Sequence, residues 1–231
     1  MSCLALPARH EVHVWCVSLG EPLGSVGATL SEGERERAAR IRADAPRQRF
    51  VLTRSALRAL LGRYLGAPPP SIAFVQGPHG KPALAESAES DLRFNLSHSG
   101  DQALLAFTCG HDVGVDIERV SAARDATAIA SRFFATQEAE ALRAIPEAAR
   151  PAAFFRCWVR KEACLKALGE GIGHGLDRIA VGVDERPAGF RRIGSVALAD
   201  LDVAPGYVAA VATTGDCERI VTGRMPNPAA Q

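Results

Sequence analysis

Lysine is scarce in this sequence of 231 residues. Only three of its 27 lysines and arginines are lysines, namely Lys81, Lys161 and Lys166. Because arginine serves elsewhere as the surface cation, each lysine reads as a compact point charge of the kind that suits a phosphate group. Two of the three flank Glu162, which favours a phosphate site in that segment.

The sequence also has little net charge and no long apolar run. The formal net charge is +1, which does not indicate a general nucleic-acid binder. No apolar run approaches the roughly 20 residues that span a bilayer, and the first residues lack the basic and apolar parts of a secretion signal. The six cysteines show no C-x-x-C spacing, so neither a zinc site nor a disulfide framework is indicated. We expect a cytoplasmic protein with free thiols and with no membrane or nucleic-acid partner.

The pattern of apolar residues predicts an α+β fold. Ser31 begins a capping box for a helix to about Arg42, and Asp44 is expected to cap a second helix that ends before Gly66. Further helices are predicted at 125–134, 137–145 and from about 151 to 168. Strands are predicted at 10–17, 72–75, 92–95, 102–108, 113–117, 178–183, 190–197, 207–213 and 218–222.

The order of these elements predicts two lobes. A strand, then helices, then strands occur twice, which favours similar α+β lobes at residues 1–112 and 113–231. The turn at 109–112 is expected to join the strands on either side of it as a hairpin.

Two carboxylates share one face of the strand predicted at 113–117. Residues two apart on a strand point the same way, so Asp116 and Glu118 lie side by side while Val113, Val115 and Ile117 fill the opposite, buried face. Neighbouring carboxylates repel each other unless a cation or a proton intervenes, and oxygen ligands of this kind suit Mg²⁺. The alternative is an edge strand whose solvent face is acidic.

A second constellation lies on the helix predicted near 151–168. Trp158, Glu162 and Lys166 are spaced four residues apart and share one stripe of the helix. Because neighbours such as Phe154 and Leu165 are apolar, the stripe borders a packed surface, where a carboxylate and a lysine could serve metal and phosphate together. The alternative is a surface ion pair worth about 0.2–0.5 kcal/mol.

The segment 95–100, Asn-Leu-Ser-His-Ser-Gly, follows a predicted strand. It is expected to be a loop that donates hydrogen bonds to an anion, or else a plain connection. Ser97 and His98 also raise the idea of a nucleophile and its base, but adjacency in sequence is no sign of triad geometry. No G-x-S-x-G elbow occurs, which disfavours a hydrolase.

Nine of the arginines lie between Arg35 and Arg63. Most are expected to face solvent as helix cations, and one or two could reach a phosphate. Arg49 and Arg54 flank the apolar run at 50–52 and are expected nearest the core face.

Taken in this order, the segments resemble the 4′-phosphopantetheinyl transferase superfamily, specifically the Sfp-type enzymes of about this length. That family has a (V/I)-G-(V/I)-D-x-E strand followed by W-x-x-K-E-(A/S)-x-x-K. The matching residues here are Val113 to Glu118 and Trp158 to Lys166. The family's G-K-P turn and N-x-S-H-S-G segment match Gly80 to Pro82 and Asn95 to Gly100. The resemblance covers nearly the whole chain, and the two main motifs together are specific.

The resemblance implies a fold and a reaction. Two pseudo-twofold-related α+β lobes are expected, with coenzyme A bound in the cleft between them. A Mg²⁺-dependent reaction moves the 4′-phosphopantetheine arm of coenzyme A to a serine of an acyl, peptidyl or aryl carrier protein and releases 3′,5′-ADP. A monomer is expected.

The resemblance also implies residue roles. Asp116, Glu118 and Glu162 match the magnesium ligands, and Glu162 also matches a residue that helps to deprotonate the serine. Lys166 matches the lysine at the pyrophosphate, so the catalytic set is Glu162, Lys166 and Asp116. Coenzyme A contacts are expected from Arg49, Arg54, Lys81, Pro82, Ser97, His98, Lys161 and Lys166. Some family members carry lysines in the first arginine-rich helix, where this chain has Glu34 and Arg37, so Arg49 is the substitute candidate for the 3′-phosphate.

The carrier protein is expected to dock near the start of the second lobe. Residues 128–134 offer apolar side chains beside a cation, which suits an acidic helical partner; the alternative is an ordinary core helix. For the whole chain, the alternative function is a noncatalytic coenzyme A or nucleotide-binding module of the same fold. Another magnesium-dependent phosphotransferase is disfavoured because neither a P-loop nor kinase signatures occur.

Overall fold

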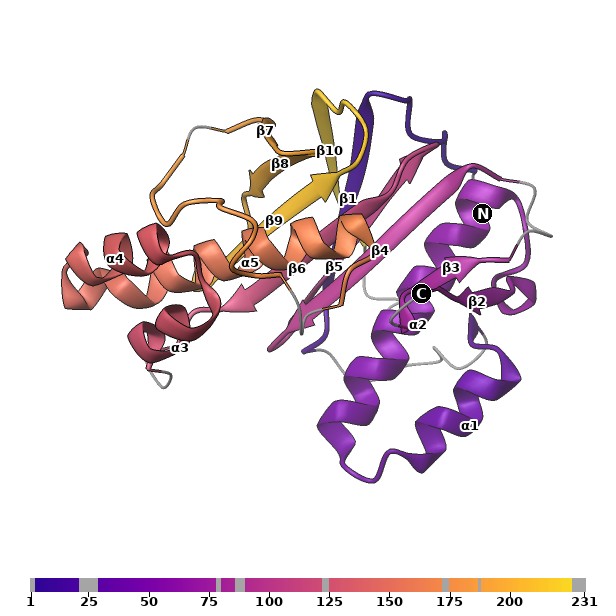
Figure 1. Cartoon of the computed structure of the whole chain (residues 1–231). Coiled ribbons are helices and arrows are strands. Elements are labelled where there is room, and N and C mark those ends of the chain that lie inside the picture. Colours follow the sequence, from indigo (N-terminus) through magenta and orange to yellow (C-terminus); the bar gives the residue numbers. More distant parts are fainter. Residues whose placement is uncertain are drawn as a thin grey trace.

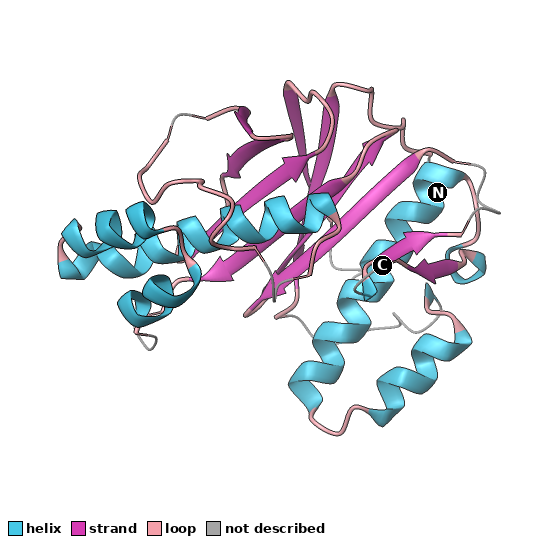
Figure 2. Ribbon diagram, in the orientation of Figure 1, coloured by secondary structure: helices cyan, strands magenta, loops and turns pink. Residues whose placement is uncertain are grey.

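Two four-stranded sheets, each with a long helix on its outer face, make up the fold in the computed structural model (Figures 1 and 2). The structure describes residues 3–20, 29–77, 80–85, 90–121, 125–171, 175–186 and 188–225. The first sheet has the order β10-β1-β5-β4 and the second has the order β6-β9-β8-β7. The predicted α+β class is confirmed.

The strands of the first sheet are β1 (Glu11–Ser18), β4 (Leu92–Ser99), β5 (Gln102–Cys109) and β10 (Arg219–Arg224). Those of the second sheet are β6 (Val113–Arg119), β7 (Arg191–Ile193), β8 (Val196–Leu201) and β9 (Tyr207–Thr213). A small separate sheet pairs β2 (Phe74–Gln76) with β3 (Pro82–Leu84). The helices are α1 (Glu32–Arg40), α2 (Asp44–Leu65), α3 (Ala126–Phe133), α4 (Thr136–Ala144) and α5 (Arg150–Leu168), with 3-10 turns η2 (Pro69–Ser71) and η5 (Glu147–Ala149). None of the helices within the described ranges is both long and apolar enough to cross a membrane.

The two halves repeat one topology. In the first half β1 is followed by helices and then by β4 and β5, which pair in the order β1-β5-β4. In the second half β6 is followed by helices and then by β8 and β9, which pair in the order β6-β9-β8. The predicted pair of similar lobes is therefore present as a structural repeat.

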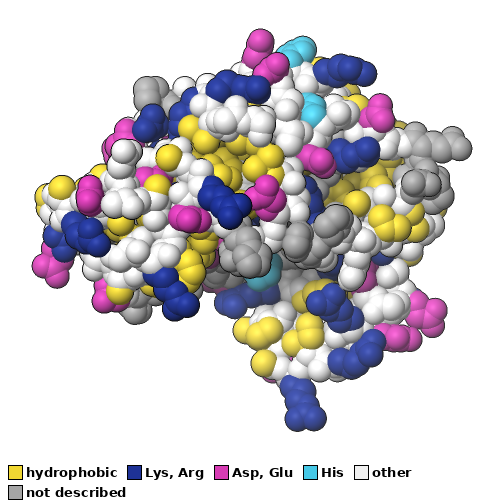
Figure 3. Space-filling view, viewed as in Figure 1, with side chains coloured by type: hydrophobic (Ala, Val, Ile, Leu, Met, Phe, Trp, Pro, Cys, Tyr) yellow, Lys and Arg dark blue, Asp and Glu magenta, His cyan; other side chains and the backbone are white. Residues whose placement is uncertain are grey.

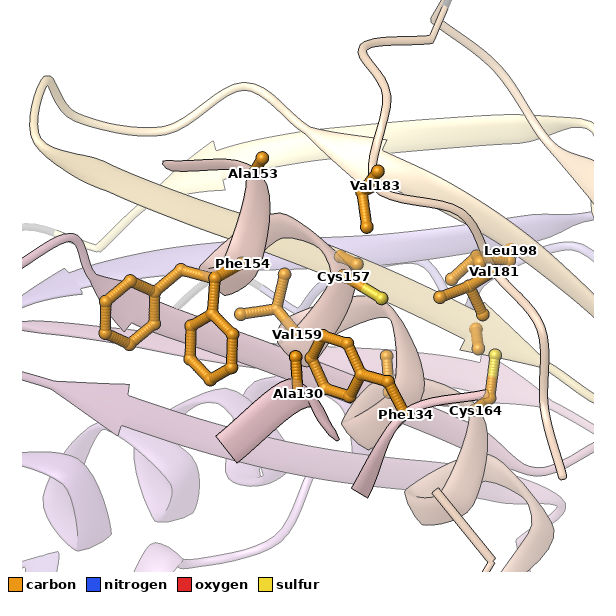
Figure 4. Close-up of a cluster of buried hydrophobic side chains, with 14 of the residues drawn as sticks. Ala130, Phe134, Ala153, Phe154, Cys157, Val159, Cys164, Val181, Val183 and Leu198 are labelled. Carbon is orange, nitrogen blue, oxygen red and sulfur yellow. The ribbon is translucent and has the colours of Figure 1, made fainter. Parts of the chain in front are cut away.

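Three apolar cores hold the layers together. Helix α2 packs on the outer face of the first sheet through Leu57, Leu60 and Leu61. The inner faces of the two sheets pack on each other through residues such as Val14, Leu104 and Val115. On the outer face of the second sheet, α5 packs together with α3, the segment at 181–183 and β8, as Figure 4 shows.

Several sequence-based expectations are corrected by the structure. The turn at 109–112 does not close a hairpin: β5 already has β1 on one edge and β4 on the other, so β6 pairs with β9 instead. The segment 95–99 is not a loop but the second half of β4. Residues 190–197 form two strands, because Gly194 turns the chain with a φ of +57°. The N-cap of α2 is Ala43 rather than Asp44.

The expected strand at 178–183 is absent from the described segment. Its alternation is nonetheless real, since Ile179 packs against the core formed with α5 and Val181 and Val183 are buried in it. Their backbone groups bond to side chains instead of a neighbouring strand: Glu138 accepts from the amides of Val181 and Gly182. The alternation of apolar residues in this segment therefore reflects burial of every second side chain and not pairing with a neighbouring strand.

The last strand crosses between the lobes. β10 pairs in parallel with β1, in the register Glu11 to Arg219. The expected division at residue 112/113 assigned this strand to the second lobe, whereas it completes the sheet of the first.

Candidate active site

Gly114 allows helix α5 to lie directly on strand β6. A Cβ at this position would lie 2.1 Å from the Ala163 carbonyl oxygen and 2.4 Å from the Ala167 nitrogen, distances that no side chain tolerates. Residues two apart on a strand share a face, so Asp116 lies on the same side as Gly114. The glycine thereby brings Asp116 to the second half of α5, where Glu162 and Lys166 lie.

Asp116, Glu162 and Lys166 form a charged cluster in which both carboxylates are buried. The Lys166 Nζ lies 2.6 Å from Asp116 Oδ1 and 3.2 Å from the Val115 carbonyl oxygen. Only 4% of Asp116 and 3% of Glu162 is exposed to solvent. The cluster thus contains two carboxylates and one amine, with little water to stabilise the remaining negative charge.

Burial raises the pKa of Glu162 to about 7, and the negative charges of Asp116 and, to a lesser extent, Glu118 add to this effect. The positive charge of Lys166 opposes the shift. A carboxylate with this pKa exchanges a proton near neutral pH, as a general base must.

The carboxylates are suited to a divalent cation. Within the described ranges, no three His, Cys, Asp or Glu side chains already form a group that could hold a metal ion. However, Asp116 Oδ2 and Glu162 Oε1 are buried and have no hydrogen-bond partner among the described residues. Unpartnered buried carboxylate oxygens are unfavourable, and oxygen ligands of this type are what Mg²⁺ takes. The donor set therefore fits Mg²⁺, with Glu118 on the same face of β6.

A cavity of about 560 Å³ lies beside this cluster, between the two lobes. Its volume is in the range of small-molecule sites. Lys166 and the helix-ending Gly169 line it from the second lobe. From the first lobe it is lined by basic and apolar side chains, including Arg37, Arg49, Phe50, Arg54, Lys81, Pro82 and His98.

Arg49 and Arg54, which were expected nearest the core face, both line the cavity. Arg54 Nη1 is buried and unpartnered within the described structure, and burial lowers the pKa of this side chain. Arg49 lies 3.7 Å from the Asp101 carboxylate and is more exposed. An anion in the cavity would supply the partner that Arg54 Nη1 lacks.

Glu34 has a structural role that the sequence did not reveal. Its carboxylate accepts a hydrogen bond from Arg58 and lies 3.7 Å from Arg54. Arg58 also donates to the carbonyl oxygens of Pro69 and Ile72, at 2.7 and 3.0 Å. Glu34 thus anchors Arg58 and lies beside Arg54, which lines the cavity. Arg37, next to it on α1, lies over the Phe50 ring and lines the cavity.

Lys81 lines the cavity, but its amine is engaged between the lobes. Nζ donates to the carbonyl oxygens of Lys166 at 2.7 Å and Val113 at 3.1 Å. Burial lowers the pKa of this amine. The bonds join the β2–β3 hairpin of the first lobe to both β6 and the end of α5.

The predicted coenzyme A contact of Lys161 is wrong. This side chain is fully buried on the other side of α5, where Nζ lies 2.5 Å from Glu138 Oε2. It also donates to the carbonyl oxygens of Leu176 and Ile179, both at 2.6 Å. With these three partners, the amine has no route to the cavity.

Ser97 and His98 point in opposite directions because they are neighbours on a strand. His98 lines the cavity, and desolvation, together with the charges of Arg49 and Lys166, lowers its pKa. Ser97 does not line the cavity; its hydroxyl donates to Asp116 Oδ1 at 2.6 Å. The structure therefore places the Ser97 hydroxyl at the Asp116 carboxylate and not in the cavity, although a coenzyme A contact was predicted for this residue.

Comparison with known proteins identifies the family. Residues 112–212 match the 4′-phosphopantetheinyl transferase superfamily, and residues 19–110 match the N-terminal 4′-phosphopantetheinyl transferase model. The chain is 40% identical over 210 residues to 4′-phosphopantetheinyl transferase HetI of Nostoc sp., covering 89% of this chain and 88% of HetI. It is 36% identical over 153 residues to psf-1 of Bacillus pumilus (62% and 63% coverage) and 39% identical over 147 residues to AcpT of Salmonella typhimurium (64% and 72%), both 4′-phosphopantetheinyl transferases. The chain belongs to the 4′-phosphopantetheinyl transferase superfamily.

Proposed function

We propose that this protein transfers the 4′-phosphopantetheine group of coenzyme A to a serine hydroxyl of an acyl, peptidyl or aryl carrier protein, releases 3′,5′-ADP and uses Mg²⁺. One observation carries the proposal. Lys166 bonds to Asp116 in the buried carboxylate cluster and at the same time lines the arginine-rich cavity between the lobes. A phosphate group in that cavity would meet both the cations and the carboxylates.

The basic side chains of the cavity suit the phosphate groups of coenzyme A. Arg49 and Arg54 extend from α2, Arg37 from α1 and His98 from β4. One guanidinium group can bind two phosphate oxygens at once. Arg54, whose Nη1 is unpartnered, is therefore a candidate for the nucleotide phosphate alongside Arg49. Lys166 lies closest to the carboxylates and is assigned to the pyrophosphate.

The reaction needs a base and a means to stabilise charge on the phosphate. Glu162, whose pKa is about 7, would accept the proton of the attacking serine hydroxyl. Lys166 would stabilise the charge that develops on the phosphate oxygens. Mg²⁺ held by Asp116, Glu118 and Glu162 would neutralise further charge on these oxygens.

The docking surface for the carrier protein is proposed on α3. Phe133 is 38% exposed, and the Arg132 guanidinium lies 5.1 Å from its ring centre. Phe134, the next residue, is buried and stacks on Phe154 with ring centres 5.3 Å apart. Of the two phenylalanines, Phe133 is therefore the candidate contact for an acidic helix and Phe134 belongs to the core.

The chain is further proposed to act as a cytoplasmic monomer with lobes at residues 1–112 and 113–231, except that β10 belongs to the sheet of the first lobe. All six cysteines are free thiols, which suits a reducing compartment. In Figure 3, basic and acidic side chains are interspersed over the face shown.

Incubation with coenzyme A, Mg²⁺ and an apo-carrier protein tests the proposal. Mass spectrometry should show one phosphopantetheine added to the carrier serine and 3′,5′-ADP released. No mass gain across a panel of acyl, peptidyl and aryl carriers would refute transferase activity. Tight coenzyme A binding by calorimetry without any transfer would instead favour the noncatalytic binding module.

A further inference from the structure

Hydrogen bonds made by side chains of β4, rather than backbone pairing of two strands, join the lobes along one seam. Strand β4 forms an edge of the first sheet and β6 an edge of the second, and the two do not pair. Asn95 Oδ1 of β4 accepts from the backbone amide of Val115 at 3.0 Å. The Ser99 hydroxyl accepts from the amide of Arg119 at 3.1 Å. Three alternate residues of β4, at 95, 97 and 99, thus face β6.

The same seam reaches two of the carboxylates. The Ser97 hydroxyl donates to Asp116 Oδ1 at 2.6 Å, and the Ser99 hydroxyl donates to Glu118 Oε2 at 2.7 Å. On each strand these residues are two apart and therefore share a face. Each serine of the first lobe consequently meets one carboxylate of the second lobe, in the same order along both strands.

At Asp116 the two carboxylate oxygens are not equivalent. Oδ1 receives both the Ser97 hydroxyl and the Lys166 amine, each at 2.6 Å. Oδ2 is buried and has no partner in the described part of the chain. At Glu118, Ser99 holds Oε2 in the same manner.

We propose that Ser97 and Ser99 are positioning residues of the metal site, an inference that rests on the proposed function. By holding Oδ1 of Asp116 and Oε2 of Glu118, they would fix the orientation of both carboxylates and leave Asp116 Oδ2 available to a cation. Mg²⁺ requires near-ideal octahedral geometry, so the orientation of each carboxylate decides how well it binds. Carboxylates that ligate metals are themselves hydrogen-bonded, and loss of such partners weakens binding.

The serines differ from Lys166 in what they supply. Lys166 neutralises part of the charge of Asp116, whereas a hydroxyl group orients the carboxylate and leaves its charge in place. Neither serine lines the coenzyme A cavity. Their loss should therefore change metal affinity and leave the intrinsic affinity for coenzyme A unchanged.

The seam also ties the metal site to the arrangement of the lobes. The two carboxylates belong to β6, while their hydroxyl partners belong to β4. A change in the relative position of these strands would break both contacts at once. The metal geometry therefore depends on the first lobe, although every proposed ligand lies in the second.

Binding of Mn²⁺, followed by electron paramagnetic resonance with saturating coenzyme A, tests the inference. Ser97→Ala should weaken Mn²⁺ binding roughly 10- to 100-fold, the range found when a residue next to a metal ligand is lost. Ser97→Thr, which keeps the hydroxyl, should retain most of the affinity. Ser71→Ala, which removes an exposed hydroxyl that bonds, among the described residues, to the Pro68 carbonyl, is the matched control and should bind like the wild type.

Calorimetry of coenzyme A binding in a chelator separates positioning from substrate contact. Unchanged coenzyme A affinity in Ser97→Ala supports the inference. A loss of coenzyme A affinity without metal, or unchanged Mn²⁺ affinity in folded Ser97→Ala, would overturn it. If Ser97→Ala does not fold, Ser99→Ala decides by the same two measurements, since Ser99 is less buried. A wild type that binds Mn²⁺ but modifies no carrier would refute the proposed function and not the positioning role.

Discussion

The Lys161 amine and the Glu138 carboxylate form an ion pair 2.5 Å apart inside the second lobe. Removal of the amine in Lys161→Ala would leave Glu138 and two carbonyl groups without their cation. Breaking a buried pair in this way costs about 3–5 kcal/mol. We expect urea denaturation to show this loss in the free energy of unfolding. In the protein that remains folded, the KM for coenzyme A should stay unchanged.

Lys166→Ala removes the other lysine of α5 and is compared with Lys161→Ala. It should abolish most transfer activity and cost less stability, because 21% of the Lys166 side chain is exposed whereas Lys161 is inaccessible. A normal KM and kcat in Lys166→Ala would remove this residue from the pyrophosphate role.

Glu162 should make the stability of the metal-free protein depend on pH. Its pKa rises from 4.5 to about 7 on folding, so the folded protein holds a proton that the unfolded chain releases between these values. The contribution to stability is full below pH 4.5 and is lost as the pH rises through about 7. The Tm of the metal-free protein at pH 5 and at pH 8 measures this contribution. Glu162→Gln should remove this pH dependence, and added Mg²⁺ should raise the Tm of the wild type more at pH 8 than at pH 5.

Asp116→Ala and Glu162→Ala are expected to abolish turnover, because each removes a carboxylate from the cluster. Loss of a general base alone commonly costs about 10²–10⁴-fold in rate. Mass spectrometry of the carrier serine over time gives the rate. Glu140→Ala, an exposed carboxylate on α4, is the control. A near-normal rate for either cluster variant would exclude that residue from catalysis.

Adjacent phenylalanines at the end of α3 offer a matched pair for the docking surface. Phe133→Ala should raise the KM for the carrier protein and leave stability almost unchanged, because the ring is 38% exposed. Phe134→Ala should instead cost about 3–5 kcal/mol of stability, as expected for a buried aromatic ring. Carrier kinetics together with chemical denaturation distinguish the two. An unaltered carrier KM in Phe133→Ala would place the docking surface elsewhere.

Gly114→Ala tests the contact between β6 and α5. The added methyl group would collide with backbone atoms of α5, which cannot rotate away. Overpacking of this kind costs about 1–3 kcal/mol or more, and displacement of α5 should also lower activity. Gly33→Ala, where nothing lies within 4 Å of the new Cβ, should be tolerated. Equal stability of the two variants would show that α5 does not need this close approach.

Sequence patterns correctly predicted the features that depend on residues close together along the chain. Strand alternation placed Asp116 and Glu118 on one face of β6, with Val113, Val115 and Ile117 buried on the other. The capping box at Ser31 is present, with Ser31 and Glu34 bonded to each other's backbone. Helical spacing put Glu162 and Lys166 on one stripe of α5. Each of these outcomes follows from the fixed period of a strand or a helix.

Tertiary structure decided the rest, because the deciding contacts join residues far apart in sequence. Lys161 and Lys166 are on the same helix, yet α5 is buried on more than one side, so its pattern could not show that one amine faces the cavity and the other faces Glu138. The seam between Ser97 and Asp116 likewise exists only because the edges of two different sheets meet. The sequence by itself determined which residues have the chemistry of a phosphate and metal site; the packing of β4, β6 and α5 decided which of them meet there.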